Sequence, residues 1–416
     1  MKRILRAAAC TLCAGVLCAV LAACAPGVET SLQEKGSPDA AESSVRPYPR
    51  TTEYVSGDNV VYFNGTSGST PLVCYLDLES LQAHVLCSVE GCTHSTQACP
   101  AYGGGHLFLT PDALYSYRSC DASYLELGSA PALGTLRVHA LDGSESHEVA
   151  KVDDGWTLGM FAQSDTAIYG TLGSDLAMLE LATGHETILQ RNFTQNNYFD
   201  NYHLAQIGND LLLPVWVGSP LEEVVFYSLS TSGELTEIRR AELNTGVPYE
   251  GKYYYADEQG RIYVLDVLTG KSTLFCDELQ YTQPDGTVRF SGQGAMYVVS
   301  GHLMAERTTP QEMPEYASKP TRLFAIPLEG GPASEILLSD FYHTYDNPLK
   351  VRAETPAGLI VVGDRVSTTY VDTGKDGSLD SREGSEERMA LISPEDYFAS
   401  NPNFRFFEQL PNPYPG

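Results

Sequence analysis

Basic residues, tryptophan and long apolar runs are all scarce in this chain. It has 26 lysine and arginine residues against 53 aspartate and glutamate residues, and its formal net charge is −27. A surface with that much negative charge repels nucleic acid and anionic lipid, so we expect no nucleic-acid partner. Beyond the N-terminus, no stretch approaches the roughly 18 uninterrupted apolar residues that a membrane-spanning helix needs. The sequence therefore argues against a nucleic-acid-binding protein and against helices that cross a membrane.

Local motifs of the common enzyme classes are missing as well. Gly270-Lys271-Ser272 resembles the end of a phosphate-binding loop, but Leu265 stands where the leading glycine belongs. The nine histidines include no pair at the i, i+4 spacing of a metalloprotease helix. Carboxylates are abundant, yet nothing in the sequence selects a catalytic pair among them. No catalytic residue is assigned.

The first 24 residues form an export signal. Lys2, Arg3 and Arg6 make a cationic start, 7–20 is uncharged, and Leu21-Ala22-Ala23-Cys24 closes the segment. These last four residues resemble the lipobox of bacterial lipoproteins, a likeness that implies acylation of Cys24 as the new N-terminus. An ordinary cleaved secretory signal with an incidental cysteine is the alternative. We expect the lipid on Cys24 to hold the chain at the extracellular side of the cell membrane.

Composition divides the rest of the chain. Residues 1–23 are the predicted signal peptide, and 24–50 contain the lipidated cysteine and a segment rich in serine, proline, glutamate and alanine. That composition cannot bury enough apolar surface to order itself, so this segment is predicted to be a flexible tether. Residues 51–410 are assigned to one folded domain, and 411–416 to a C-terminal tail.

A strand, turn and strand unit recurs along the folded domain. Copies end in a glycine that a tight hairpin requires, as at Gly143, Gly184, Gly233 and Gly270. These glycines follow one another at roughly 40 to 50 residues, a period typical of propeller blades of three or four strands. We therefore predict an all-β fold, a β-propeller of seven blades whose last blade covers 350–407. Six or eight blades stay open, and a two-sheet sandwich is the structural alternative.

A cluster of sulfur and imidazole side chains lies within 13 residues near the first unit. Cys87, Cys92, His94 and Cys99 could close a tetrahedral zinc site, because zinc prefers thiolate and neutral imidazole ligands. Exported cysteines more often pair, and beyond Cys24 the chain has an even six. These six are Cys74, Cys87, Cys92, Cys99, Cys120 and Cys276. A disulfide framework, a zinc site and free thiols all stay open.

An acidic stretch resembles the twelve-position calcium loop of EF-hands and dockerins. Asp372, Asp376, Asp380 and Glu383 occupy its first, fifth, ninth and twelfth positions, with glycine at the sixth. Two departures weaken the match, because Gly374 replaces the third-position carboxylate and a strand pattern, rather than a helix, precedes the loop. A structural calcium ion and a plain acidic hairpin are the two alternatives.

Two aromatic stretches could line a binding face. Tyr198, Phe199 and Tyr202 lie in an asparagine-rich segment that we expect to be a surface loop. Tyrosine stacks on sugar rings and anchors protein partners, so this loop is a candidate binding surface. In Tyr253–Tyr255, alternate side chains are predicted instead to fill the space between blades.

The cysteine cluster resembles a segment of uncharacterised β-propeller lipoproteins of Gram-positive gut bacteria. The likeness includes Cys74-Tyr75-Leu76-Asp77-Leu78 before the cluster, Pro100-Ala101-Tyr102 after it, and the ending 389–397. It covers the two ends of the chain better than its middle. The resemblance implies an extracellular propeller lipoprotein of unassigned function, and it brings no catalytic residues.

These features predict a monomeric, lipid-anchored, extracytoplasmic propeller that binds or scaffolds a glycan, a peptide or an envelope protein. The competing class is a polysaccharide hydrolase or lyase with acid and base carboxylates at the propeller funnel. A clustered, desolvated group of Asp, Glu, His or Tyr side chains at the funnel mouth would favour the enzyme, whereas a solvated funnel would favour binding. A third class is an accessory factor in envelope assembly or signalling.

Overall fold

The computed structural model describes most of the chain after residue 43. The described residues are 44–47, 54–67, 70–119, 133–195, 197–199, 204–218, 223–243, 246–257, 259–282, 288–290, 292–308, 321–342, 345–373 and 379–408. Nearly all their secondary structure is strand, with one short helix, α1 (Pro394–Phe398), and one 3-10 turn, η2 (Asp154–Leu158). Within these ranges no helix has the length and apolarity that crossing a membrane requires.

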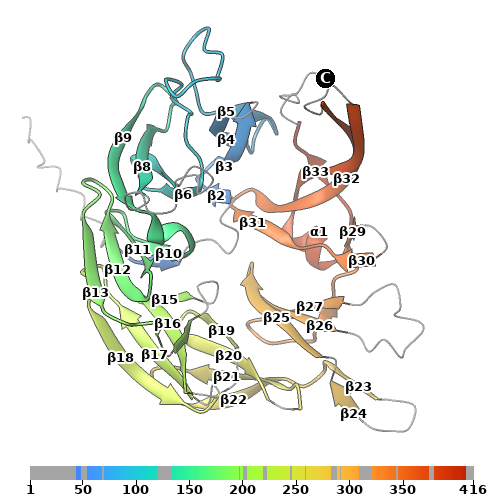
Figure 1. Ribbon diagram of the computed structural model, residues 1–416. Coiled ribbons are helices and arrows are strands. Elements are labelled where there is room, and N and C mark those ends of the chain that lie inside the picture. The colour runs from blue at the N-terminus through green and yellow to red at the C-terminus, as the bar shows by residue number, and fades with distance from the viewer. Residues whose placement is uncertain are drawn as a thin grey trace, which may run out of the picture. The chain divides into compact units, whose positions relative to one another are not determined.

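Seven antiparallel sheets form the blades of a β-propeller (Figure 1). Blade 1 consists of β2 (Tyr54–Ser56), β3 (Val60–Ser67), β4 (Thr70–Asp77) and β5 (Ala83–Val85). Blade 2 consists of β6 (His106–Leu109), β7 (Ala113–Arg118), β8 (Leu133–Ala140) and β9 (Ser146–Asp153). Blade 3 consists of β10 (Met160–Gln163), β11 (Ala167–Leu172), β12 (Asp175–Glu180) and β13 (Glu186–Gln190), with β1 (Arg46–Pro47) beside β10.

The other four blades follow in the same order. Blade 4 consists of β14 (Asn197–Phe199), β15 (Ala205–Ile207), β16 (Asp210–Val217), β17 (Glu223–Leu229) and β18 (Leu235–Ala241). Blade 5 consists of β19 (Gly246–Tyr249), β20 (Lys252–Ala256), β21 (Ile262–Asp266) and β22 (Ser272–Cys276). Blade 6 consists of β25 (Gly292–Val299), β26 (His302–Thr308), β27 (Thr321–Pro327) and β28 (Ser334–Glu335). Blade 7 consists of β31 (Val351–Thr355), β32 (Gly358–Thr373), β33 (Leu379–Ile392) and β34 (Arg405–Phe406).

Two small hairpins occur in the segments of the chain that connect consecutive blades. β23 (Gln280–Thr282) pairs with β24 (Val288–Phe290) before blade 6, and β29 (Ser339–Tyr342) pairs with β30 (Tyr345–Pro348) before blade 7. The predicted fold class, the count of seven blades and the extent of the last blade are therefore confirmed.

The turn between the third and fourth strands repeats from blade to blade. Gly143, Gly184, Gly233 and Gly270 have φ values of 69°, 69°, 83° and 76° there. Such positive φ is open to glycine at little cost, which is why the glycines mark the repeat in the sequence. Blade 1 uses Leu81 instead, with a φ of 61°.

The core is divided among the contacts between neighbouring blades. Seven clusters of buried side chains occur in the described residues, one at each blade-to-blade interface. Tyr253 and Tyr254 show how one strand serves two of them. Tyr253 packs against blade 4 beside Phe226, and Tyr254 packs against blade 6 beside Leu303. The prediction that these tyrosines fill the space between blades is confirmed.

Among the described strands, none is shared between the first and last blades of the ring. All four strands of blade 7 are consecutive in the C-terminal part of the chain. Phe407 then packs between Val61 of blade 1 and Ile360 of blade 7, and the Glu408 N–H donates to the Leu81 carbonyl at 2.8 Å. Side-chain packing therefore carries most of the closure.

The predicted tether needs one correction. Residues 44–47, which fell inside the predicted flexible segment, lie on the propeller as β1 and the residues before it. Arg46 and Pro47 pair with Gln163 and Ala162 of β10, and the fully buried Val45 enters the core between blades 3 and 4. The physical reason is that β10 leaves a backbone edge unpaired, and β1 together with one apolar side chain can cover it.

Candidate functional site

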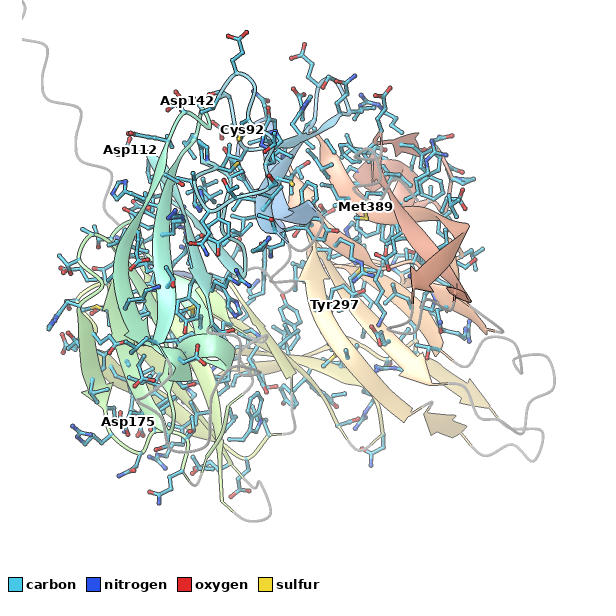
Figure 2. All side chains as sticks on the ribbon, turned by 45° about the horizontal axis from the view of Figure 1, so that its top comes forward. Cys92, Asp112, Asp142, Asp175, Tyr297 and Met389 are labelled. Carbon is cyan, nitrogen blue, oxygen red and sulfur yellow. The ribbon has the colours of Figure 1, made fainter. Side chains whose placement is uncertain are left out.

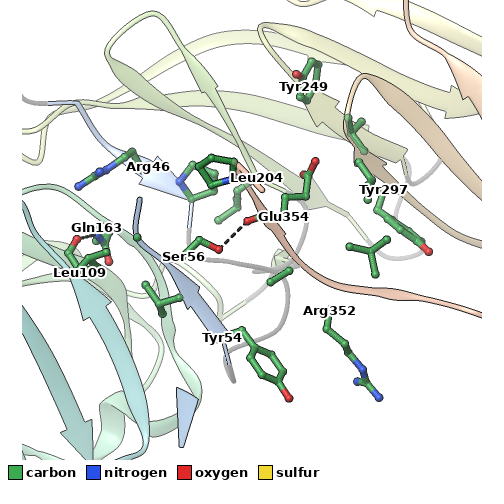
Figure 3. Close-up of a pocket in the computed structure, with 18 of the residues that line it drawn as sticks. Arg46, Tyr54, Ser56, Leu109, Gln163, Leu204, Tyr249, Tyr297, Arg352 and Glu354 are labelled. Carbon is green, nitrogen blue, oxygen red and sulfur yellow. Dashed lines mark hydrogen bonds between the residues drawn. The ribbon is translucent and has the colours of Figure 1, made fainter. Parts of the chain in front are cut away.

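A cavity of about 720 Å³ lies where the innermost strands meet (Figure 3). Every blade contributes to its wall, and one lining residue from each, in order, is Ser56, Leu109, Gln163, Leu204, Tyr249, Tyr297 and Glu354. Arg46 and Pro47 of β1 complete the wall. The sequence predicted a central funnel but not the residues that line it, because they come from segments far apart in the chain. The repeat offered the one usable signal, since most of the lining comes from the first strand of each unit and the residues next to it.

Three charged side chains in the cavity wall, Arg46, Arg352 and Glu354, have partners. The Arg46 guanidinium lies 2.6 Å from an Asp165 carboxylate oxygen, and its side chain is 43% exposed. The Glu354 carboxylate accepts hydrogen bonds from the backbone N–H of Ser300 at 2.6 Å and from its hydroxyl at 2.8 Å. Exposed ion pairs of this kind add little stability. They do fix the side chains that face the cavity.

The cavity lacks the features of an acid and base catalyst. Among the lining residues that the structure describes, the only carboxylates are Asp58 and Glu354, both exposed, and there is no histidine, cysteine or lysine. Burial raises the pKa of Tyr249, and Glu250 and Glu354 raise it further, so the phenol stays protonated near neutral pH. General acid and base catalysis needs a group whose pKa lies near the working pH. The wall is mostly proline and aliphatic side chains, which suits binding.

The four predicted metal ligands, Cys87, Cys92, His94 and Cys99, converge in the structure. Their ligand atoms all lie within 4.8 Å of one another, and His94 Nδ1 lies 3.4 Å from Cys99 Sγ. Within the described part of the chain, no other group of three or more histidine, cysteine and carboxylate side chains gathers in this way. All five described cysteines are free thiols, and Cys120 lies outside the described residues. The disulfide alternative therefore gains no support from the described cysteines.

The connection from β5 to β6 carries this cluster, between blades 1 and 2. Figure 2 shows Cys92 beside the blade 2 turn that carries Asp142. In agreement, the Ser88 N–H donates to the Gly143 carbonyl of that turn at 2.9 Å. On the other side, the Val73 N–H of β4 donates to the Ala101 carbonyl at 2.8 Å. The connection is thus attached to both blades.

The thiols of the cluster differ in their electrostatics. The pKa of Cys92 is lowered, chiefly because the backbone N–H of His94 donates to its sulfur. Burial raises the pKa of Cys99 to about 12, although the Ala101 N–H donates to that sulfur. Cys74, which lies in the same apolar cluster but outside the four ligands, also has its pKa raised by burial to about 12.

Behind the cluster lies a histidine that the sequence gave no reason to single out. His139 is 1% exposed, with Nδ1 2.9 Å from the Pro100 carbonyl oxygen and Nε2 2.9 Å from Ser116 Oγ. Burial lowers its pKa to about 4, so the imidazole is neutral at pH 7. Its hydrogen bonds fix the end of the connection onto blade 2, which is a structural role.

The acidic stretch near the C-terminus forms a hairpin. Asp372 at the end of β32 pairs with Asp380 in β33, and Glu383 lies further along β33, opposite Thr369. Asp376 lies outside the described residues. This backbone matches the plain acidic hairpin that the sequence left open, and calcium binding stays a prediction.

The asparagine-rich aromatic segment is not simply a loop. Asn197–Phe199 form β14, in which Tyr198 pairs with Trp216 of β16. The loop expectation was wrong here because Tyr and Phe favour strands, and β15 covers only the first part of β16. Tyr202 lies outside the described residues. A binding role for Tyr198, Phe199 and Tyr202 stays a prediction.

Comparisons with known proteins assign neither a family nor an activity to this chain. No family model matches the chain, and no curated protein matches it. An oligogalacturonate lyase from Vibrio parahaemolyticus is similar over 60% of this chain and 71% of its own, at 10% identity and a TM-score of 0.39. The β-propeller domain of the Trilobed protease from Pyrococcus furiosus is similar over 82% and 97%, at 8% identity and a TM-score of 0.39. A puromycin hydrolase is similar over 85% of this chain, which spans 53% of the hydrolase, at 12% identity and a TM-score of 0.41. None of these similarities transfers an activity.

Proposed function

We propose that this protein is a lipid-anchored binding module that holds its ligand in the central cavity, on the outer side of the cell membrane. The observation that carries the proposal is the cavity itself, whose wall draws on all seven blades. Its carboxylates are exposed, and its two arginines, Arg46 and Arg352, are paired with Asp165 and Glu387. A wall of this kind can bind a molecule, but its described residues offer no acid and base pair that would cleave it.

The chemistry of the wall points to a neutral, hydroxyl-rich ligand, and we assign it to a glycan segment. Arg46 is neutralised by Asp165, and Arg352 lies 3.3 Å from Glu387, so an acidic sugar would meet no uncompensated cation. The half-buried Tyr249 offers a ring on which a sugar can stack, together with a hydroxyl that stays protonated. The net charge of −27 further disfavours anionic polysaccharides.

A binding experiment with one matched control tests the cavity. We expect the purified full chain to bind neutral oligosaccharides, such as a cello- or manno-oligosaccharide series, in calorimetric titration. Tyr249→Ala should weaken that binding about tenfold, which corresponds to roughly 1.4 kcal/mol. Tyr255→Ala should leave it unchanged, because Tyr255 stacks on Tyr263 and is not a lining residue.

Three outcomes would contradict the proposal. Equal affinities for the wild type and Tyr249→Ala would show that the ligand binds elsewhere. Release of shorter sugars during the titration, detected by mass spectrometry, would assign the protein to the polysaccharide hydrolases or lyases. Binding of peptides but of no glycan would refute the assigned ligand class.

The anchor has a separate test. We expect Cys24→Ala to move the protein from the membrane fraction to the medium, because the lipid supplies the membrane affinity that the acidic surface lacks. Cys18→Ala, a change of the same kind within the predicted signal, should leave the protein on the membrane. Membrane retention of Cys24→Ala would show that another element anchors the chain.

A further inference from the structure

We propose that Cys87, Cys92, His94 and Cys99 bind one zinc ion in a closed tetrahedral site that fastens the connection between blades 1 and 2. The site is independent of the ligand proposed for the central cavity. It is structural, because four protein ligands leave no coordination position for a substrate.

The distances fit a tetrahedral zinc ion. With Zn–S near 2.3 Å and Zn–N near 2.0 to 2.1 Å, two sulfurs lie about 3.8 Å apart across the ion, and a sulfur and a nitrogen lie about 3.6 Å apart. His94 Nδ1 and Cys99 Sγ are already 3.4 Å apart, and no pair among the four ligand atoms exceeds 4.8 Å. Small side-chain movements would bring all four onto one ion.

The backbone supports thiolates at this position. The sulfur of Cys92 accepts the N–H of His94, and the sulfur of Cys99 accepts the N–H of Ala101, so each accepts the amide two residues further on. Hydrogen bonds from outside the ligand set orient metal ligands and stabilise their charge. Gly91 and His94 have φ values of 73° and 54°, and these left-handed residues turn the chain so that its ligands face one another.

A disulfide accounts for less of this arrangement. One disulfide would join two sulfurs at about 2.05 Å. It would not explain why the third sulfur and the imidazole lie beside them. In the structure, Cys92 interacts with the sulfurs of both Cys87 and Cys99, so no pair is singled out. Three soft sulfurs and one imidazole within ligand distance are the donor set that zinc prefers.

The length of the connection gives the ion a function. About twenty residues between β5 and β6 contain no strand, and connections of that length without secondary structure are uncommon in compact domains. The neighbouring backbone contacts reach blade 1 through Ala101 and blade 2 through Ser88. A zinc ion between them would join both attachments and hold β6, whose residue Leu109 lines the central cavity.

The direct test is metal analysis of the purified full chain, kept reduced and supplied with zinc. We expect about one zinc per chain by elemental analysis. We also expect the full chain loaded with Co²⁺ to show the sulfur charge-transfer and intense d–d bands of a tetrahedral thiolate complex. These two measurements on the wild type need no variant, so a failure of variants to fold cannot obscure them.

Variants then assign the ligands. Cys99→Ser and His94→Ala should each lower the bound zinc at least tenfold. Cys74→Ser is the matched control, because it removes a buried thiol from the same apolar cluster without removing a ligand, and it should retain the zinc.

Three results would overturn the proposal. They are an absence of zinc and of cobalt–thiolate bands in the reduced wild type, full zinc retention by Cys99→Ser, or equal loss of zinc in Cys74→Ser. A wild-type chain whose thiols become alkylatable only after reduction, even when it is produced with zinc, would instead establish the disulfide framework.

Discussion

Among single residues, the buried imidazole of His139 links folding to pH. Its pKa is about 4 in the folded protein, because burial and the nearby Arg137 disfavour the charged form, against an ordinary value of 6.5. Between these values the unfolded chain binds the additional proton, so the free energy of unfolding falls as pH drops from 6.5 towards 4. At pH 5 the loss from this group is about 2 kcal/mol, and above pH 7 it is absent.

His139→Gln should remove this contribution, because an amide can still donate to Pro100 and interact with Ser116 but does not titrate. We expect the stability difference between wild type and variant, measured by urea denaturation, to be about 2 kcal/mol smaller at pH 5 than at pH 7.5. All other titrating groups are the same in both proteins, so their contributions cancel in this difference. A difference that does not change with pH would show that His139 is accessible to protons in the folded state.

For the proposed zinc ligands, the sequence predicted the residue types but not that the four side chains converge. The four residues occur within 13 positions, which indicated a site. Their convergence depends on left-handed φ at Gly91 and at His94, and although histidine adopts that conformation more often than most residues, it does so too rarely to predict it from the sequence. His139 was unpredictable for a related reason, since its partner Pro100 lies 39 residues away.

Among the elements, β1 is the one that a single substitution should detach most easily. It is two residues long, and Val45 beside it is its main apolar attachment, packed near Phe161 and Leu213. Val45→Asp would bury an unpaired carboxylate, so β1 should leave the propeller while the seven blades stay folded. We expect the backbone amides of 44–46 to exchange hydrogen for deuterium at least ten times faster than in wild type, with little change in melting temperature.

Val45→Ile serves as the control for β1, because it keeps an apolar side chain of nearly the same shape and should keep the wild-type exchange rate. Mass spectrometry of peptides that contain 44–46 measures the exchange there. Equal exchange in wild type and Val45→Asp would show that β1 is not held on blade 3 in solution.

Strand elements were predictable where the chain repeats and not where it departs from the repeat. Hairpin glycines such as Gly184 and Gly233 located the blades, because a tight turn needs positive φ. β1 was missed because a serine- and proline-rich composition hid one buried valine. β14 was missed because asparagines suggested a loop, whereas its pairing partner, β16, lies beyond it in the chain.

For the whole molecule, the repeat predicted the ring of seven blades and a central funnel, but not the residues that line the cavity there. The lining residues lie on the innermost strands or next to them, so the site exists only once all seven blades are assembled. The ring itself depends on a closure between blades 1 and 7, where Phe407 is 3% exposed beside Val61 and Ile360.

Phe407→Ala should therefore weaken the entire propeller. Removing a buried phenylalanine costs about 3 to 5 kcal/mol, and here the loss falls on the one interface that no continuous chain bridges. We expect a lower urea midpoint and faster amide exchange in β2 and β31, the innermost strands on the two sides of the closure. Phe404→Ala makes the same change three residues earlier, at a partly buried position packed against the interface of blades 6 and 7, and should cost less than half as much. If both variants cost the same and neither speeds exchange in β2, the ring is held closed by contacts other than Phe407.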